Sequence, residues 1–136
     1  MKPALIDTNI LPLFFRGHEA VVRQFRTYLE TYETINLSII TYYEIVSGLK
    51  HRQAAKQLAA FIDFAAQNTI LPLTPAAADL AAEAYAVLRQ RGEPLDDIDL
   101  LIAGTAIANG LVLVTHNRQH FDRISGLIVE DWVEVG

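Results

Sequence analysis

The sequence predicts a three-layer α/β/α domain built on a central, mainly parallel sheet of four to five strands. Short apolar runs alternate with longer segments of helical periodicity along the chain. The strand-like runs are apolar at nearly every position, which is typical of parallel strands covered by helices on both faces. With 136 residues, 51% of them hydrophobic, the chain is long enough for one such core, so we expect a single domain over residues 1–136.

Two strands and four helices are expected in the first half of the chain. In order they are a strand at 3–6, helices at 9–15 and 19–32, a strand at 33–37, and helices at 39–49 and 52–67. The helices repeat apolar residues every three to four positions. Gly17 ends the first helix, and Ser38 can cap the third. The fourth helix is predicted to bury the face formed by Ala55, Leu58, Ala59, Ile62 and Ala66.

The second half is expected to complete the alternation. In order it holds a strand at 69–73, helices at 75–91 and 97–109, a strand at 111–115, a short turn or helix at 117–121, and a strand at 127–129. Thr74 and Pro75 are a strong start signal, because Thr caps helices and Pro suits the first helical position. Gly92 and Gly110 follow the two long helices and are suited to end them.

Charge is distributed unevenly along the chain. Residues 1–68 carry seven Lys or Arg against six Asp or Glu, whereas residues 69–136 carry four against ten. The net charge of −5 argues against nucleic-acid binding by overall charge alone. The acidic residues of the second half are either solubility charge or part of a cation site, and composition does not decide between the two.

Cysteine is absent from the sequence. Disulfides, thiolate zinc sites and a cysteine nucleophile are therefore excluded, and the composition suits a reducing cytosol. The apolar runs are too short to span a bilayer, and Asp7 interrupts the first of them where a signal peptide would be apolar. We expect a cytoplasmic protein with no membrane association.

Three carboxylates are expected to meet beyond the carboxyl ends of the strands, where open α/β sheets place their sites. Asp7 follows the first strand, Glu44 lies on a helix that is apolar nearly all round, and Asp99 opens the helix at 97–109. Each has a structural alternative: Asp7 as a helix cap, Glu44 as an exposed position, and Asp99 as a first-turn acid favoured by the helix dipole. Together, with no Cys and no His pair at ligand spacing, they describe a hard-cation site for Mg²⁺ or Mn²⁺.

Four segments carry a family resemblance over essentially the whole chain. They read LIDTN at 5–9, SIITYYE at 38–44, DLLIA at 99–103 and LVTHNR at 113–118. In order and spacing they resemble the PIN-domain ribonucleases, in particular the VapC-type toxins of bacterial type II toxin–antitoxin systems. The resemblance implies a PIN-like fold and an Mg²⁺- or Mn²⁺-dependent endoribonuclease that cleaves RNA by metal-activated water. It also implies a cognate antitoxin, a homodimer, and a toxin–antitoxin hetero-oligomer.

The resemblance also assigns roles residue by residue. Asp7, Glu44 and Asp99 match the acidic metal-binding and catalytic residues of the family, and Thr8 and Thr115 match its supporting hydroxyls. A fourth acid follows the Thr-x-Asn stretch in many relatives, but His120 stands here, which leaves the number of metal ions open. The remaining supporting candidates are Asn117, Asp96 and Asp97. The candidates for RNA contact are Arg16, Lys50, Arg52, Arg118 and His120.

Two other functions compete with this interpretation. An aspartyl phosphatase would use Asp7 as its nucleophile, but such enzymes usually have a second Asp two residues later, where this chain has Asn9. A catalytically inactive PIN-like interaction module would not need the three acids. The helices at 39–49 and 52–67, with Tyr42, Tyr43 and Phe61, are expected to offer apolar surface to a second copy and to an antitoxin segment.

Overall fold

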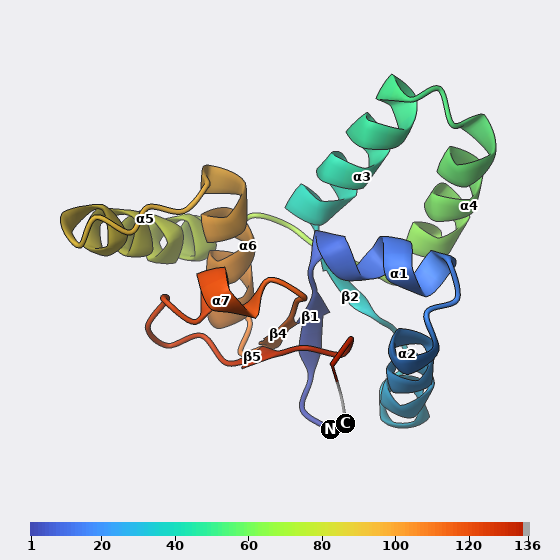
Figure 1. Ribbon diagram of the computed structural model, residues 1–136, viewed down its shortest axis with the longest axis horizontal. Coiled ribbons are helices and arrows are strands. Elements are labelled where there is room, and N and C mark those ends of the chain that lie inside the picture. Colours follow the sequence, from blue (N-terminus) through green and yellow to red (C-terminus); the bar gives the residue numbers. More distant parts are fainter. Residues whose placement is uncertain (135–136) are drawn as a thin grey trace.

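A five-stranded, fully parallel sheet forms the centre of the molecule in the computed structural model, which describes residues 1–134 (Figure 1). The strands are β1 (Ala4–Ile6), β2 (Asn36–Ser38), β3 (Thr69–Leu71), β4 (Val112–Val114) and β5 (Val129–Glu130). Their order in the sheet is β3-β2-β1-β4-β5. The predicted three-layer α/β/α architecture is confirmed, and the sheet proves to be parallel throughout rather than mainly so.

The helices agree with the sequence prediction to within a few residues. They are the 3-10 helix η1 (Thr8–Ile10), α1 (Leu11–Phe15), α2 (Glu19–Thr31), α3 (Ile39–His51), α4 (Ala55–Ala66), α5 (Pro75–Gln90), α6 (Asp97–Ala108) and α7 (Arg118–Phe121). The Ser38 side chain caps α3 by accepting from Thr41 N, and Thr74 caps α5 by accepting from Ala77 N. Within residues 1–134, no helix has the length and apolar character needed to cross a membrane.

Two hydrophobic cores lie on opposite faces of the sheet. Ala4 and Ile6 point into the core covered by α1 to α4, whereas Leu5, between them, points into the core covered by α5 and α6. Val112, Leu113 and Val114 alternate in the same way. Side chains of successive strand residues point to opposite faces, so strands buried on both sides must be apolar at every position. Burial of the strands on both faces therefore explains the continuous apolar runs in the sequence.

The buried face of α4 differs from the prediction. Phe61 and Ala65 point into the core, with 2% and 3% of their surfaces exposed, while Ile62 is 40% exposed and Ala55, Ala59 and Ala66 are also exposed. Of the predicted inward residues, Leu58 alone packs partly against the core. An alanine-rich helix is apolar on several faces, so periodicity does not decide which face is buried. The aromatic ring of Phe61 removes the most apolar area from water and sets the orientation.

The strand order changes direction between β1 and β4. From β1 the chain builds β2 and β3 on one side, and then returns through α5 and α6 to place β4 on the other side of β1. In open α/β sheets, such a switch leaves a crevice beyond the carboxyl ends of the two strands. Asp7 and Thr115 are the first residues after β1 and β4, so both lie at this crevice.

Close packing between α5 and α6 depends on Gly104. A Cβ atom at this position would lie 2.3 Å from the backbone oxygen of Ala77. Gly104→Ala is therefore expected to lower the free energy of unfolding by about 2 kcal/mol or more, since the backbones of both helices would have to separate. Gly48→Ala is the matched control, because its Cβ would meet only the side chain of Arg52 at 3.5 Å. That change should stabilise α3 by up to about 1 kcal/mol. Urea denaturation of both variants would check this, and equal stabilities would contradict it.

Candidate functional site

Asp7 is held in one orientation by hydrogen bonds from Thr8, at the start of η1, and Thr115, which follows β4. Its Oδ1 accepts a hydrogen bond of 2.8 Å from Thr8 N, and its Oδ2 accepts one of 2.7 Å from Thr115 Oγ1. The residue also caps η1, so the structural alternative of a helix cap applies to it as well. Only 4% of its surface is exposed. Asp7 is thus a nearly buried carboxylate positioned at the switch between β1 and β4.

Glu44 is joined to the end of β1 through Thr8. The Thr8 hydroxyl donates to Glu44 Oε1 at 2.6 Å, and the buried Thr41 hydroxyl lies 3.0 Å from Thr8 Oγ1. Thr41 lies one turn before Glu44 on α3, so both side chains face the same way. Thr8, which the sequence analysis named as a supporting hydroxyl, therefore joins the carboxylate of Glu44 to the chain segment that begins with Asp7.

Asp99 completes the acidic group from the first turn of α6. Burial raises its pKa above the usual range, and the nearby charges of Asp96 and Glu44 raise it further. His120 acts in the opposite direction and lowers the same pKa. Of the two neighbouring acids, Asp96 raises the pKa of Asp99, whereas Asp97 lines a separate hollow between α5 and α6.

Burial is also the main reason that the pKa of Asp7 is raised, from 3.8 to about 6. The hydrogen bonds from Thr115 and Thr8 lower it, while the charges of Asp99 and Glu44 raise it. Between these two pKa values the folded protein binds more protons than the unfolded chain does. The stability of the metal-free protein therefore falls as the pH rises from about 4 to about 6.

The donor set fits a hard divalent cation. Asp7, Glu44 and Asp99 offer oxygen only, and the mutual repulsion of their charges would be relieved by a cation among them. The three carboxylates do not offer three oxygen atoms, one from each, that all lie within 4.8 Å of one another. Only the side chains of His116, Asp131 and Glu134 come that close among the described residues.

Thr115 is the centre of a hydrogen-bond network that includes Asn9, whose role the sequence did not indicate. Thr115 Oγ1 donates to Asp7, accepts from Asn117 N at 3.0 Å, and lies 3.5 Å from Asn9 Nδ2. Asn9 Oδ1 accepts from His116 N at 3.2 Å. No supporting role was predicted for Asn9, because its link to Thr115 depends on the pairing of β1 with β4.

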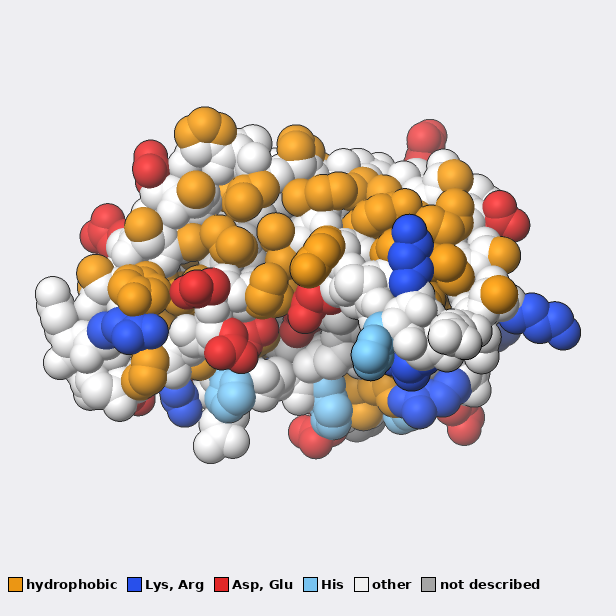
Figure 2. Space-filling model, turned by 90° about the horizontal axis from the view of Figure 1, so that it is seen from above, with side chains coloured by type: hydrophobic (Ala, Val, Ile, Leu, Met, Phe, Trp, Pro, Cys, Tyr) orange, Lys and Arg blue, Asp and Glu red, His pale blue; other side chains and the backbone are white. Residues whose placement is uncertain are grey.

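The predicted RNA-contact residues do not form one cluster. Arg16 and Arg52 line a groove of about 570 Å³ whose lining also includes Thr8 and Glu44. Lys50 is exposed on α3, outside the lining of that groove. Arg118 pairs with Asp122 at 3.4 Å, and His120 Nδ1 lies 2.7 Å from Asn117 Nδ2. Acidic side chains gather near the middle of the face beyond the strand ends, with hydrophobic and histidine side chains beside them (Figure 2).

Comparison with known proteins adds an independent line of evidence. Residues 4–127 match the family model of the PIN domain. The chain is 31% identical over 133 residues to the tRNA(fMet)-specific endonuclease VapC of Shigella flexneri, covering 97% of this chain and 99% of that protein. It is 33% identical over 134 residues to Ribonuclease VapC2 of Haemophilus influenzae, covering 98% and 100%.

Solved structures of toxin–antitoxin complexes contain chains of the same fold. One is VapBC2 from Rickettsia felis bound to a DNA fragment from its promoter, with a TM-score of 0.85, 28% identity, and coverage of 95% of this chain and 98% of that one. Another is DNA-bound VapBC from Salmonella typhimurium, with a TM-score of 0.84, 29% identity, and coverage of 97% and 99%. The similarity extends over the whole sheet and its helices.

Proposed function

The chain belongs to the PIN domain family, and on that basis we propose that it is a metal-dependent endoribonuclease and the toxin of a type II toxin–antitoxin pair. One observation carries the proposal. Three carboxylates, one following β1, one on α3 and one in the first turn of α6, lie close enough for their charges to influence one another, in a chain whose curated relatives are ribonucleases. We propose that residues 1–136 act as one domain in the cytoplasm, where the cysteine-free composition suits the reducing conditions.

Asp7 and Asp99 would hold Mg²⁺ or Mn²⁺, with Glu44 completing the acidic group. When bound, the cation would supply the Lewis acidity that activates water and stabilises the leaving oxygen of a phosphodiester. Thr115 keeps Asp7 in its orientation, and Thr8 does the same for Glu44. Asn117 in turn positions Thr115 through its backbone N–H. These side chains act by orienting carboxylates, which lowers the reorganisation needed when substrate binds.

The groove beside the acidic group is proposed to bind RNA along its arginine-lined border. Arg52→Gln is expected to raise KM for RNA with little change in kcat, since it removes a phosphate contact and leaves the carboxylates intact. The plot of log(kcat/KM) against log salt should become shallower by roughly 0.7 to 1. Lys56→Gln, which removes an exposed charge on α4 that is not part of the groove lining, is the control. A kcat effect without a KM effect would contradict the assignment.

An antitoxin segment is proposed to occupy the same groove and so block the acidic group. The lining is largely apolar and comes from α1, α3 and α4, with Leu11, Ile45 and Phe61 among its members. Phe61 was expected on the surface, but it is buried and contributes only the wall of this groove. Tyr43, which is 64% exposed on α3, is the stronger candidate for a homodimer contact.

Cleavage of a mixed RNA pool tests the proposed function. The purified chain with Mg²⁺ or Mn²⁺ is expected to cut a subset of structured RNAs at internal positions, and Glu44→Gln should reduce this cutting strongly. No cleavage with either cation would favour the inactive interaction module. A trapped phosphoenzyme at Asp7 would favour the aspartyl phosphatase.

A further inference from the structure

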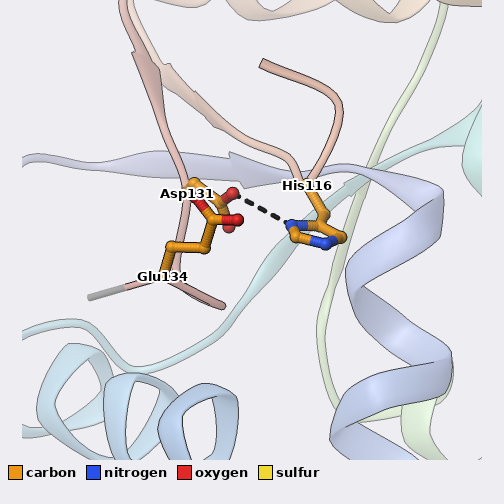
Figure 3. Close-up of side chains that lie close together, drawn as sticks. All are labelled: His116, Asp131 and Glu134. Atoms are coloured by element: carbon orange, nitrogen blue, oxygen red, sulfur yellow. Dashed lines mark hydrogen bonds and ion pairs between the residues drawn. The ribbon is translucent and has the colours of Figure 1, made fainter. Parts of the chain in front are cut away.

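A second set of metal-ligating side chains lies next to the acidic group but is formed by different residues. His116 follows β4, and Asp131 and Glu134 follow β5 (Figure 3). One ligand atom from each lies within 4.8 Å of the other two. The register pairs Val114 with Glu130, so the residues that follow the two strands leave the sheet side by side. Sequence patterns give no sign of this set, because 15 residues separate His116 from Asp131.

Asp131 is already oriented at both of its oxygens. Oδ1 accepts from Val133 N at 2.8 Å, and Oδ2 lies 3.0 Å from His116 Nδ1. The Asp131 side chain is only 11% exposed, whereas that of His116 is 43% exposed. A carboxylate fixed in this way loses little conformational freedom when it binds a ligand, so the set is partly organised in advance.

The side chains of His116, Asp131 and Glu134 carry more negative than positive charge, which favours binding of a cation. Asp131 and Glu134 bring two carboxylates together, and a single imidazole faces them. Among residues 1–134, no lysine or arginine forms an ion pair with either carboxylate. Like charges held this close repel each other unless a cation lies between them.

We propose that His116, Asp131 and Glu134 bind a divalent transition-metal ion of the Co²⁺, Ni²⁺ and Zn²⁺ class. An imidazole nitrogen with two carboxylate oxygens favours these ions, whereas the oxygen-only group at Asp7 favours Mg²⁺ or Mn²⁺. One ligand atom from each of the three side chains already lies within 4.8 Å of the other two, so small side-chain movements would bring all three to bonding distance of one ion. The bound ion would take the place of the direct hydrogen bond between His116 and Asp131.

A metal at this set connects the segment after β5 to the loop between β4 and α7. That loop begins with Thr115 and His116, and the Thr115 hydroxyl holds Asp7. The expected consequence is a more stable β4–β5 edge, because ligands that bind only the folded state stabilise it. This site depends on its own three side chains and not on the proposed ribonuclease activity.

Co²⁺ binding to the tag-free chain tests the proposal, with millimolar Mg²⁺ present to fill the oxygen-only group. We expect one equivalent of Co²⁺ by calorimetry, a visible absorption spectrum with nitrogen–oxygen character, and a rise in Tm of several degrees at high excess. His116→Asn keeps a side chain that can still donate to Asp131, so it should fold normally. It should weaken Co²⁺ binding about tenfold or more, as should Asp131→Asn.

Two controls make the result decisive. His51→Gln removes an exposed histidine at the end of α3 and should leave Co²⁺ binding unchanged. Asp7→Asn should also leave it unchanged, because Asp7 belongs to the other set. Equal Co²⁺ binding by the wild type and His116→Asn would overturn the proposal. Loss of binding in Asp7→Asn would overturn it too, since the Co²⁺ would then occupy the acidic group at β1.

Discussion

Asp7→Asn is expected to lower RNA cleavage at least about a hundredfold while the chain remains folded. The change keeps the size of the side chain but removes the most buried carboxylate of the acidic group. If Asp7 binds the catalytic cation as proposed, its loss removes several kcal/mol of transition-state stabilisation, and about 3 kcal/mol already corresponds to a hundredfold in rate. Asp63→Asn, the same change at an exposed position of α4, is the matched control for activity.

The same variant should be more stable than the wild type in EDTA at neutral pH. Raising the pKa of Asp7 from 3.8 to about 6 costs on the order of 3 kcal/mol when the group is ionised. The amide that replaces this carboxylate would forfeit about 1 kcal/mol, because it cannot accept from both Thr8 and Thr115. A net gain of about 1 to 2 kcal/mol in the free energy of unfolding follows.

Denaturation across the pH range separates the two interpretations of Asp7. The wild type should lose stability between about pH 4 and pH 6, and Asp7→Asn should lack that part of the dependence. Lost cleavage with retained stability supports a site. A variant that no longer folds would show instead that Asp7 acts mainly as the cap of η1.

Metal removal is expected to have an equally large effect. EDTA should abolish cleavage, and excess Mg²⁺ or Mn²⁺ should restore it, because the oxygen-only donor set leaves the Lewis acid to the cation. The RNA fragments should carry 5′-phosphate and 3′-hydroxyl ends, since the proposed mechanism uses water and not the ribose 2′-OH as the nucleophile. End-labelling of the fragments measures this directly.

Catalysis by histidine is the alternative mechanism that the EDTA and end-labelling measurements would detect. His116 and His120 lie near the crevice, and a histidine-driven ribonuclease would leave 2′,3′-cyclic phosphate ends. Cyclic ends, or cleavage that persists in EDTA, would transfer the catalytic role to them. His116→Asn is informative here as well, because its cleavage should still require Mg²⁺ if the acidic group alone is catalytic.

The architecture could be predicted from the sequence because it depends on hydrophobic patterns and helix caps, which involve residues close together in the chain. Continuous apolar runs between helical segments require a parallel sheet with two covered faces. Ser38 and Thr74 mark helix starts through hydrogen bonds to residues three positions later, which are local in the chain. Asp7 and Asp99 could be selected because each follows a strand or begins a helix at the edge where α/β sheets place their sites.

Contacts between segments far apart in the chain decided the features that could not be predicted from the sequence. Periodicity left the orientation of α4 open, and packing of Phe61 into the core settled it. The link between Asn9 and Thr115 exists because β1 pairs with β4, and the set of His116, Asp131 and Glu134 exists because β4 pairs with β5. Local sequence determines which segments are buried and where they end. The order of strands in the sheet decides which of those ends lie next to each other. That order depends on how all the helices and strands together bury their apolar surfaces, so it cannot be read from any one segment.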